Sequence, residues 1–244
     1  MRYKCIVAYD GYDYFGYQIQ NHEPQTIQQT IQEALKKLLK EEITIYASGR
    51  TDRKVHALGQ VFHFDTTLNL KTQAILKGLN SLLPSSISIL KVTKANKNFH
   101  ARYDVKAKQY LYRIRNDRPD PFLTRYVTFI KEPIDITKLK KAGQLFVGEH
   151  NFYNFTTNKK EEVATFVKTI FLVQITHTKK EIQILFEGSG FLRSMVRLMV
   201  GAMIAVATNK KDDDYILSLL HLTSKEKCSY KADPQGLYLK KVKY

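Results

Sequence analysis

One short polar segment gathers the residues best suited to chemistry. Arg50, Asp52, Arg53 and Lys54 stand within five positions of each other. A carboxylate kept ionised by a neighbouring cation can act as a nucleophile or as a general base. The same residue types also form ordinary surface ion pairs, and both interpretations stay open at this point. Asp52 is therefore the candidate catalytic residue, with Arg50 as a candidate partner.

Apolar runs on both sides of this segment have the pattern of strands. Ile43–Tyr46 precedes it and Val61–Phe64 follows it. We therefore expect strands at 43–48 and 60–65, joined by a polar loop. Loops held on a rigid framework are where binding and catalytic residues concentrate, so this position agrees with a functional role for Asp52.

The rest of the first half predicts regular elements around this loop. A strand is expected over 3–9, and Thr26 opens a helix with a capping box. A second helix ends at Pro84, and a strand over 87–92 follows. The order is β-α-β-β-α-β, which is a ferredoxin-like plan.

The second half repeats this order from residue 107 onward. It contains a hairpin over 164–177 and 181–187 and an apolar helix that runs to about Ala207. We therefore expect an α+β fold in which two ferredoxin-like halves pack with a central cleft. The expected domains are 1–103 and 104–244.

Composition points to a polyanionic partner. Lys and Arg number 39 against 23 Asp and Glu, which gives a net charge of +16. Such a balance favours nucleic acid, and 15 Tyr and 13 Phe can supply stacking faces. The alternative is that lysine simply fills solvated surface.

Cysteine count and terminal pattern favour a cytoplasmic protein. The two cysteines, Cys5 and Cys228, are too few for a disulfide framework or a zinc site. Met1–Lys4 enters a strand directly, so no signal peptide is expected. The longest apolar run, 200–207, is too short to cross a membrane.

Several motifs resemble one family. GRTDRKVHALGQ is similar to the catalytic loop of the TruA family of tRNA pseudouridine synthases, whose pattern is GRTDxGVHAxGQ. YDGYDYFGYQIQ resembles the family's YDGxxFxGWQxQ, with Tyr17 in place of Trp. The segment from Phe99 to Ile114 resembles FHARxxAxxKxYxYxI, and MVRLMVG matches MVRxxxG. The resemblance extends from Tyr9 to Leu239.

This resemblance implies isomerisation of uridine to pseudouridine in the anticodon arm of tRNA, at positions 38, 39 and 40. It implies no cofactor or metal, and a homodimer. Asp52 would start the reaction, by attacking the flipped nucleotide or by abstracting a sugar proton. The implied substrate-binding residues are Arg50, Tyr110, Arg197 and Leu237.

The implied roles of these four residues differ, and some have simpler alternatives. Arg50 would occupy the place of the flipped base or hold phosphate, and Arg197 would pair with Asp52. Tyr110 would lie on the target base, and Leu237 would line the uridine pocket. The alternatives are a core position for Tyr110, a different carboxylate such as Glu187 as the partner of Arg197, and simple packing for Leu237.

One residue departs from the family's pattern, and two other functions are alternatives to the synthase. Lys54 replaces the family's Gly, and a positive φ there would strain a lysine. The first rival is a non-catalytic RNA-binding protein on the same fold. The second is a ribonuclease that uses His56 or His63, for which the spacing gives little support.

Overall fold

The computed structural model describes residues 1–20, 25–224 and 226–244, which form two compact units. The first unit comprises Met1–Lys106 together with Tyr238–Tyr244, and the second comprises Ala107–Leu237. The return of the C-terminal residues to the first unit was not predicted. The folding domains expected over 1–103 and 104–244 stay a prediction.

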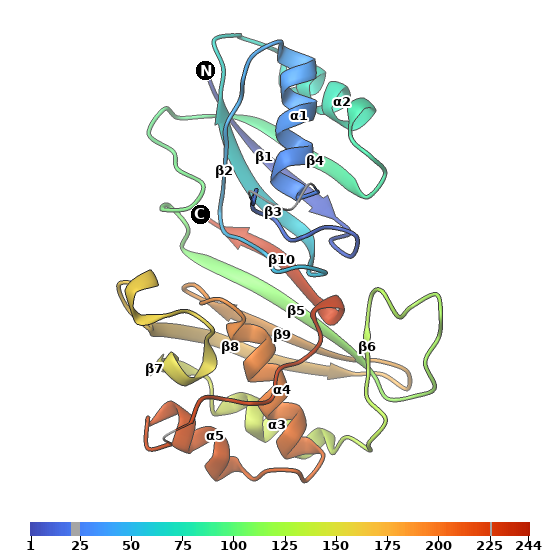
Figure 1. Ribbon diagram of the computed structural model, residues 1–244, viewed down its shortest axis with the longest axis vertical. Coiled ribbons are helices and arrows are strands. Elements are labelled where there is room, and N and C mark those ends of the chain that lie inside the picture. Colours follow the sequence, from blue (N-terminus) through green and yellow to red (C-terminus); the bar gives the residue numbers. More distant parts are fainter. Residues whose placement is uncertain (21–24, 225) are drawn as a thin grey trace. The chain divides into compact units, whose positions relative to one another are not determined.

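The first unit has the predicted ferredoxin-like order. Its antiparallel strands follow the order β4-β1-β3, and β2 pairs with β3. Helices α1 and α2 lie together beside this sheet (Figure 1). The elements are β1 (Arg2–Tyr9), α1 (Ile27–Leu39), β2 (Ile45–Ala47), β3 (His56–Asp65), α2 (Thr72–Leu82) and β4 (Ile87–Ala95).

Strand β3 is longer than expected, because residues 56–59 belong to it rather than to the loop. Strand β10 (Leu237–Lys243) lies parallel to its beginning, with Tyr238 opposite His56. Gly59 permits this approach, since a Cβ there would come within 2.8 Å of the Lys240 carbonyl oxygen. The predicted loop between the strands is therefore shortened to 48–55.

Helix α1 begins where the sequence places its cap. The Thr26 side chain accepts a hydrogen bond from the Gln29 backbone N–H at 3.3 Å. The Gln29 side chain donates to Glu33 at 3.0 Å instead of reaching back to Thr26, so only one half of the predicted capping box is formed. The N–H groups of Ile27 and Gln28 donate to the carbonyls of Gly16 and Tyr17, so the preceding loop satisfies amides of the first turn.

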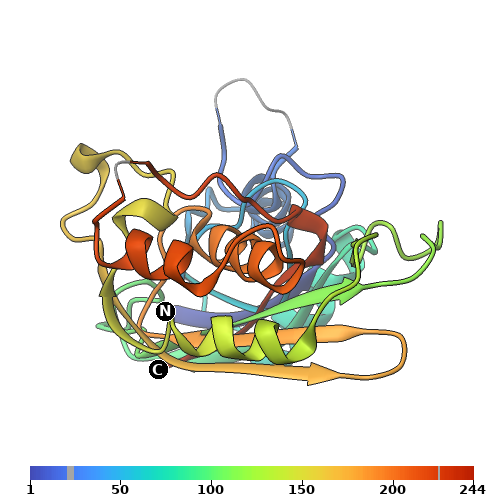
Figure 2. The ribbon, with the colours of Figure 1, turned by 90° about the horizontal axis from the view of Figure 1, so that it is seen from below.

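The second unit contains a sheet of order β5-β9-β8-β7, with the short β6 parallel to β5. Helix α3 packs on β8, where Gly143 lies against Val173 and Ile175. Figure 2 shows the long β8–β9 hairpin and the helices of this unit. The elements are β5 (Ala107–Arg115), β6 (Thr128–Phe129), α3 (Ile136–Gln144), β7 (Gly148–Asn151), β8 (Val167–His177), β9 (Ile182–Gly188), α4 (Met195–Ala207) and α5 (Asp213–Leu220), with short 3-10 turns at Tyr153–Phe155, Lys160–Glu162 and Pro234–Gly236.

Helix α4 is the centre of the second core. It is buried on nearly every side, and the predicted apolar stripe of Met195, Met199, Met203 and Val206 is confirmed as core. A helix that is apolar all round must lie inside a protein. Any polar side chain on α4 therefore needs a partner.

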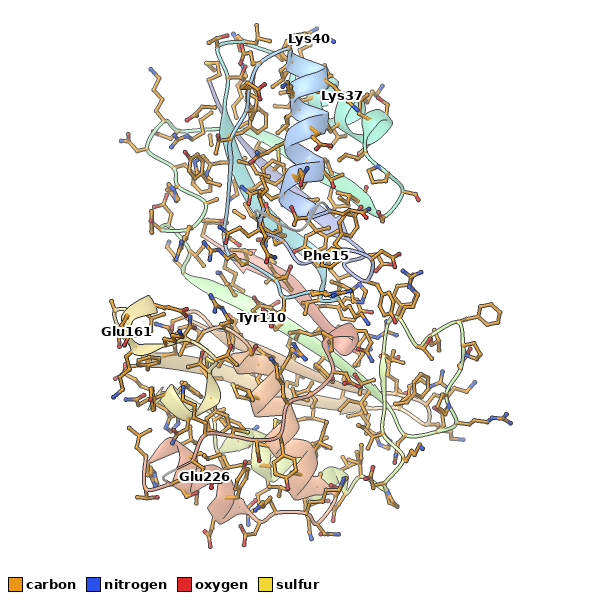
Figure 3. All side chains as sticks on the ribbon, in the orientation of Figure 1. Phe15, Lys37, Lys40, Tyr110, Glu161 and Glu226 are labelled. Atoms are coloured by element: carbon orange, nitrogen blue, oxygen red, sulfur yellow. The ribbon has the colours of Figure 1, made fainter. Side chains whose placement is uncertain are left out.

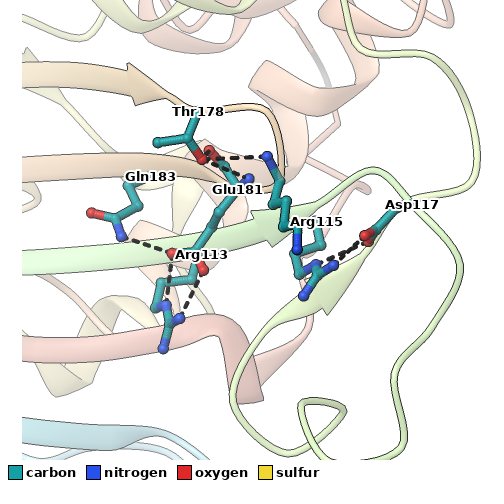
Figure 4. A network of polar contacts seen from close by, with 7 residues as sticks. Arg113, Arg115, Asp117, Thr178, Glu181 and Gln183 are labelled. Carbon is teal, nitrogen blue, oxygen red and sulfur yellow. Dashed lines mark hydrogen bonds and ion pairs between the residues drawn. The ribbon is translucent and has the colours of Figure 1, made fainter.

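A polar network at one end of the second unit joins the β8–β9 hairpin to β5 (Figure 4). Arg113 donates two hydrogen bonds to Glu181, at 2.9 and 2.7 Å, and Gln183 donates a third at 2.7 Å. This fork geometry favours the ionised carboxylate, and these contacts lower the pKa of Glu181. Arg115 is similarly engaged by Asp117.

Candidate active site

Asp52 stands at the start of a tight turn in the first unit. Its carbonyl accepts a hydrogen bond from the Val55 N–H at 3.1 Å, and its side chain is half-buried. Lys54, inside this turn, has φ of 64°, in the left-handed region. The strain expected for a lysine at the family's glycine position is therefore present. Arg50 is exposed two residues before Asp52.

A second loop, 10–17, supports the Asp52 turn from the side. Gly16 has φ of 92°, and a Cβ there would lie 3.0 Å from the Thr51 carbonyl oxygen. The Tyr17 N–H donates to this same carbonyl at 3.1 Å. At Gly11 a Cβ would lie 2.0 Å from the Val55 carbonyl oxygen. Glycine at these two positions lets the backbones meet directly, which fixes both ends of the turn.

Aromatic rings of loop 10–17 cover the cations that follow Asp52. The Arg53 guanidinium lies 4.3 Å from the centre of the Phe15 ring, and Lys54 Nζ lies 4.8 Å from that of Tyr12. Such cation–π contacts are favourable and orient the charged groups. Figure 3 shows Phe15 at the opposite end of α1 from Lys37 and Lys40.

Buried polar side chains hold the loop from beneath. Gln60 accepts from the Ser48 hydroxyl at 2.6 Å and donates to the Gly49 carbonyl at 2.8 Å. The hydroxyls of Tyr9 and Thr51 lie 2.9 Å apart. Burial raises the pKa of Tyr9, so its phenol stays neutral and keeps this hydrogen bond.

His56 belongs to the support of the loop. Its Nδ1 accepts from the Gly11 N–H at 3.2 Å and lies 3.1 Å from an Asp10 carboxylate oxygen. Its ring stacks on Tyr238 at 4.8 Å. His63 is buried too, and its desolvation lowers its pKa to about 4. The positions of both histidines disfavour the ribonuclease interpretation.

In the second unit, Tyr110 lies on β5 with its ring almost fully buried. The Phe191 ring meets it edge to face, at 5.0 Å between centroids. Leu237, also buried, follows the 3-10 turn Pro234–Gly236. The Tyr112 hydroxyl donates to the Asp233 carbonyl at 2.8 Å, which ties this turn to β5.

Arg197 is one of the few residues of α4 that is not fully buried. Its Nε donates to the Ala232 carbonyl at 2.8 Å, and the Ala232 N–H donates to the Arg197 carbonyl at 3.0 Å. Gly201 allows this segment to lie against the helix, since a Cβ there would be 2.3 Å from the Tyr230 carbonyl oxygen. Glu187, the alternative partner, accepts a hydrogen bond from Gln109 at 2.6 Å.

The structure thus brings Arg50 and Asp52 into one loop, and it sets Tyr110, Arg197 and Leu237 on separate elements of the second unit. The supporting residues Gly11, Gly16, Gln60 and Phe191 were not predicted. For Gly11 and Gly16, the glycines of the YDG and FGY motifs were the signal in the sequence that could have revealed their supporting role.

Among residues 1–20, 25–224 and 226–244, no cluster of three or more His, Cys, Asp or Glu could hold a metal ion. No helix in the same ranges is long and apolar enough to cross a membrane.

Comparison with known proteins agrees with these features. A family model described as tRNA pseudouridine synthase matches residues 5–104 and 142–244. The tRNA pseudouridine synthase A 1 of Bacillus cereus is 42% identical over 249 residues, covering 100% of this chain and 98% of that protein. The tRNA pseudouridine synthase A of Oceanobacillus iheyensis is 39% identical, covering 100% and 96%. That of Staphylococcus saprophyticus is 37% identical, covering 99% and 90%.

Proposed function

We propose that Asp52 starts the reaction of this chain, which belongs to the tRNA pseudouridine synthase family and isomerises uridine to pseudouridine in tRNA. One observation carries the proposal. The Asp52 carboxylate is half-buried on a turn that Gly11 and Gly16 brace at both ends. A carboxylate held in this way has little freedom to lose when substrate binds, which favours catalysis.

The reaction exchanges one bond for another. The bond between uracil N1 and the sugar C1′ breaks and a bond between C5 and C1′ forms. The proton on C5 passes to solvent, and N1 takes up a proton, so the mass of the nucleotide is unchanged. Asp52 can begin this sequence as a nucleophile or as a base toward a sugar proton. Either route uses only the substrate and protein side chains, in agreement with the expected absence of a cofactor.

Roles for the other residues follow from their chemistry. Arg50 is an exposed cation close to Asp52, which suits contact with phosphate or with the space left by the flipped uridine. Tyr110 offers a ring already held by Phe191, which suits stacking on the extruded base. Leu237 supplies an apolar wall for the same base.

Arg197 is proposed to pair with Asp52 and keep it ionised. Its Nε is committed to Ala232, which fixes the plane of the guanidinium group. The terminal nitrogens would carry the pairing with Asp52, because a bidentate fork matches a carboxylate. We further propose a homodimer that acts in the cytoplasm on the anticodon arm, at positions 38, 39 and 40.

Tritium release from [5-³H]uridine-labelled tRNA tests the role of Asp52. We expect D52A and D52N to lose activity by about 10⁴-fold or more, because the reaction cannot begin. Binding of tRNA and the thermal unfolding midpoint should stay near those of the unchanged protein. D214N, which removes an exposed charge on α5, is the matched control and should remain active.

The outcomes separate the enzyme from the non-catalytic RNA-binding alternative. Activity in D52N close to that of D214N would refute the assignment of Asp52. Binding without tritium release by the unchanged protein, on several tRNAs with uridine at 38, 39 or 40, would favour the alternative. Mapping the released tritium to single positions in variant tRNAs would test the proposed positions.

A further inference from the structure

Four rings form a continuous series on the first unit, away from the Asp52 turn. We call Tyr46, His63, His100 and Tyr103 the aromatic ladder. Tyr46 stacks on His63 at 5.1 Å with 20° between the planes, and His100 meets His63 edge-on at 4.8 Å. His100 and Tyr103 lie 4.3 Å apart at 30°. The series starts on β2, crosses β3 and ends in the segment that follows β4.

The two ends of the aromatic ladder face solvent, whereas its centre is buried. Tyr103 is 75% exposed and Tyr46 is 49% exposed, while His63 is 1% exposed. Folding normally hides large aromatic rings, because they contribute much apolar area to a core. Tyr103 therefore stands out as an aromatic ring held out to solvent.

Hydrogen bonds hold the rings in place. The Ala101 N–H donates to His63 Nδ1, and the Arg102 N–H donates to His100 Nδ1, both at 3.1 Å. The Tyr244 hydroxyl donates to the Ala101 carbonyl at 2.7 Å. On the other side of Tyr103, the Asp104 N–H donates to the His100 carbonyl at 3.1 Å. The exposed ring of Tyr103 thus extends from a segment that is hydrogen-bonded on both sides, so it is presented in a defined position.

The charges around the aromatic ladder are mostly positive, since Arg2, Lys4 and Arg102 stand beside the carboxylates of Asp65 and Asp104. The Arg102 guanidinium lies 5.9 Å from the centre of the Tyr103 ring and is exposed. Lys4 Nζ lies 3.7 Å from the centre of the neighbouring Tyr244 ring. The chain carries +16 overall. An aromatic face beside a cation is the usual arrangement for binding single-stranded nucleic acid, where the ring stacks on a base and the cation holds phosphate.

We propose that the aromatic ladder is a second RNA-binding site, where an unpaired base of the substrate tRNA stacks on Tyr103 and Arg102 contacts an adjacent phosphate. The site lies outside the set of Asp52, Arg50, Tyr110, Arg197 and Leu237. It rests on the tRNA activity of the chain and not on the proposed role of Asp52. Its contribution is to binding, so it acts on KM for tRNA rather than on kcat.

Fluorescence provides a direct test because the chain has no tryptophan. In Y103W the only indole stands at the end of the aromatic ladder. We expect tRNA to quench its emission, and heparin, a polyanion without bases, to leave it nearly unchanged. The matched control is L82W, on α2, where Leu82 is 44% exposed and outside the aromatic ladder. Its emission should respond little to tRNA.

Kinetics provide the second test. We expect Y103A to raise KM for tRNA about five- to tenfold, because stacking of one base is lost, and to leave kcat within about twofold. Y103F keeps the ring and should retain the KM of the unchanged protein. The double variant D52N/Y103W separates the two proposals. It should lose turnover, because Asp52 is replaced, and tRNA should still quench its indole emission.

Three results would overturn the proposal. Equal quenching of Y103W by heparin and tRNA would indicate that the polyanion binds by charge alone and that no base stacks on the ring. Quenching that grows with protein concentration in the absence of RNA would indicate contact between copies of the chain. An unchanged KM in Y103A, with Y103W and Y103A both folded by circular dichroism, would show that no base stacks there.

Discussion

Two regions of the molecule use glycine in the same way for different ends. In the first unit, Gly11 meets the Val55 carbonyl beside the Asp52 turn. In the second unit, Gly201 of α4 meets the Tyr230 carbonyl. In both places a methyl group would collide with backbone. The first contact joins two loops, whereas the second joins a helix that is buried on nearly every side to a segment that lies along it.

The difference concerns what each contact controls. The loop contact sets the position of a half-buried carboxylate. The helix contact sets how α4 fits into the second core. A close-packed interior transmits such a change to many neighbours. Disturbing the first should therefore change chemistry as well as stability, and disturbing the second should change mainly stability.

Among the variants that test this comparison, G11A should have the largest effect. The added Cβ must displace the Val55 carbonyl, which moves the Asp52 turn. A shift of about 1 Å can reduce turnover by about 100-fold, and we expect a loss of this size in kcat. The unfolding free energy should also fall, by about 1–3 kcal/mol, because the added Cβ meets buried backbone. Tritium release and urea denaturation measure the two quantities.

G201A should lose mainly stability and less turnover. We expect its unfolding free energy to fall by about 3 kcal/mol, the upper end for an overpacked core, with a smaller loss of kcat in the folded fraction. G190A is the control, because a Cβ there meets only Lys168 Cδ at 3.9 Å. Equal loss of kcat in the folded fractions of G11A and G201A would break the distinction between the two regions.

Acid should destabilise the first unit before the second. The pKa of His63 is lowered to about 4 from its ordinary 6.5, chiefly by burial. Between these values the unfolded chain binds a proton that the folded chain does not, so stability is lost as pH falls from 6.5 to 4. A shift of this size corresponds to as much as about 3 kcal/mol. In the second unit, Arg113 lowers the pKa of Glu181, so that loss begins only below about 4.5.

Hydrogen exchange at a series of pH values can follow the two units separately. Protection of β1 and β3 should decline between pH 6.5 and 4, while β5 and β9 stay protected. H63Q should flatten this decline, and E181Q should leave it unchanged. Simultaneous loss of protection in both units across that range would contradict the predicted order.

The smallest effect concerns Lys54. Its φ of 64° strains any residue with a Cβ. We expect K54G to be more stable than K54A by about 0.5–1 kcal/mol, after the greater freedom of unfolded glycine is subtracted. Both variants lose the contact with Tyr12, so their difference isolates the backbone. Thermal unfolding measures it, and a more stable K54A would show that the turn changes conformation in the variants.

The sequence alone was sufficient for several of the elements and for the family. The spacing of apolar residues predicted β1, α1 and α4, because residues a few positions apart share one face of a strand or helix. The motif around Asp52 was sufficient to indicate tRNA pseudouridine synthesis, since a long run of unusual residue types rarely recurs by chance. The sequence also showed that a positive φ at Lys54 would be strained, because lysine replaces the family's glycine there, and the structure supplied the φ of 64°.

Only the tertiary structure revealed which distant segments meet. The early start of β3 depends on β10, which comes from the other end of the chain. The contacts of Gly11 with Val55, and of Gly201 with Tyr230, join segments that no local pattern relates. The aromatic ladder likewise needs three separate segments to bring its rings together. Local patterns encode how a segment buries one face, whereas the partner of that face is decided by the packing of the whole chain.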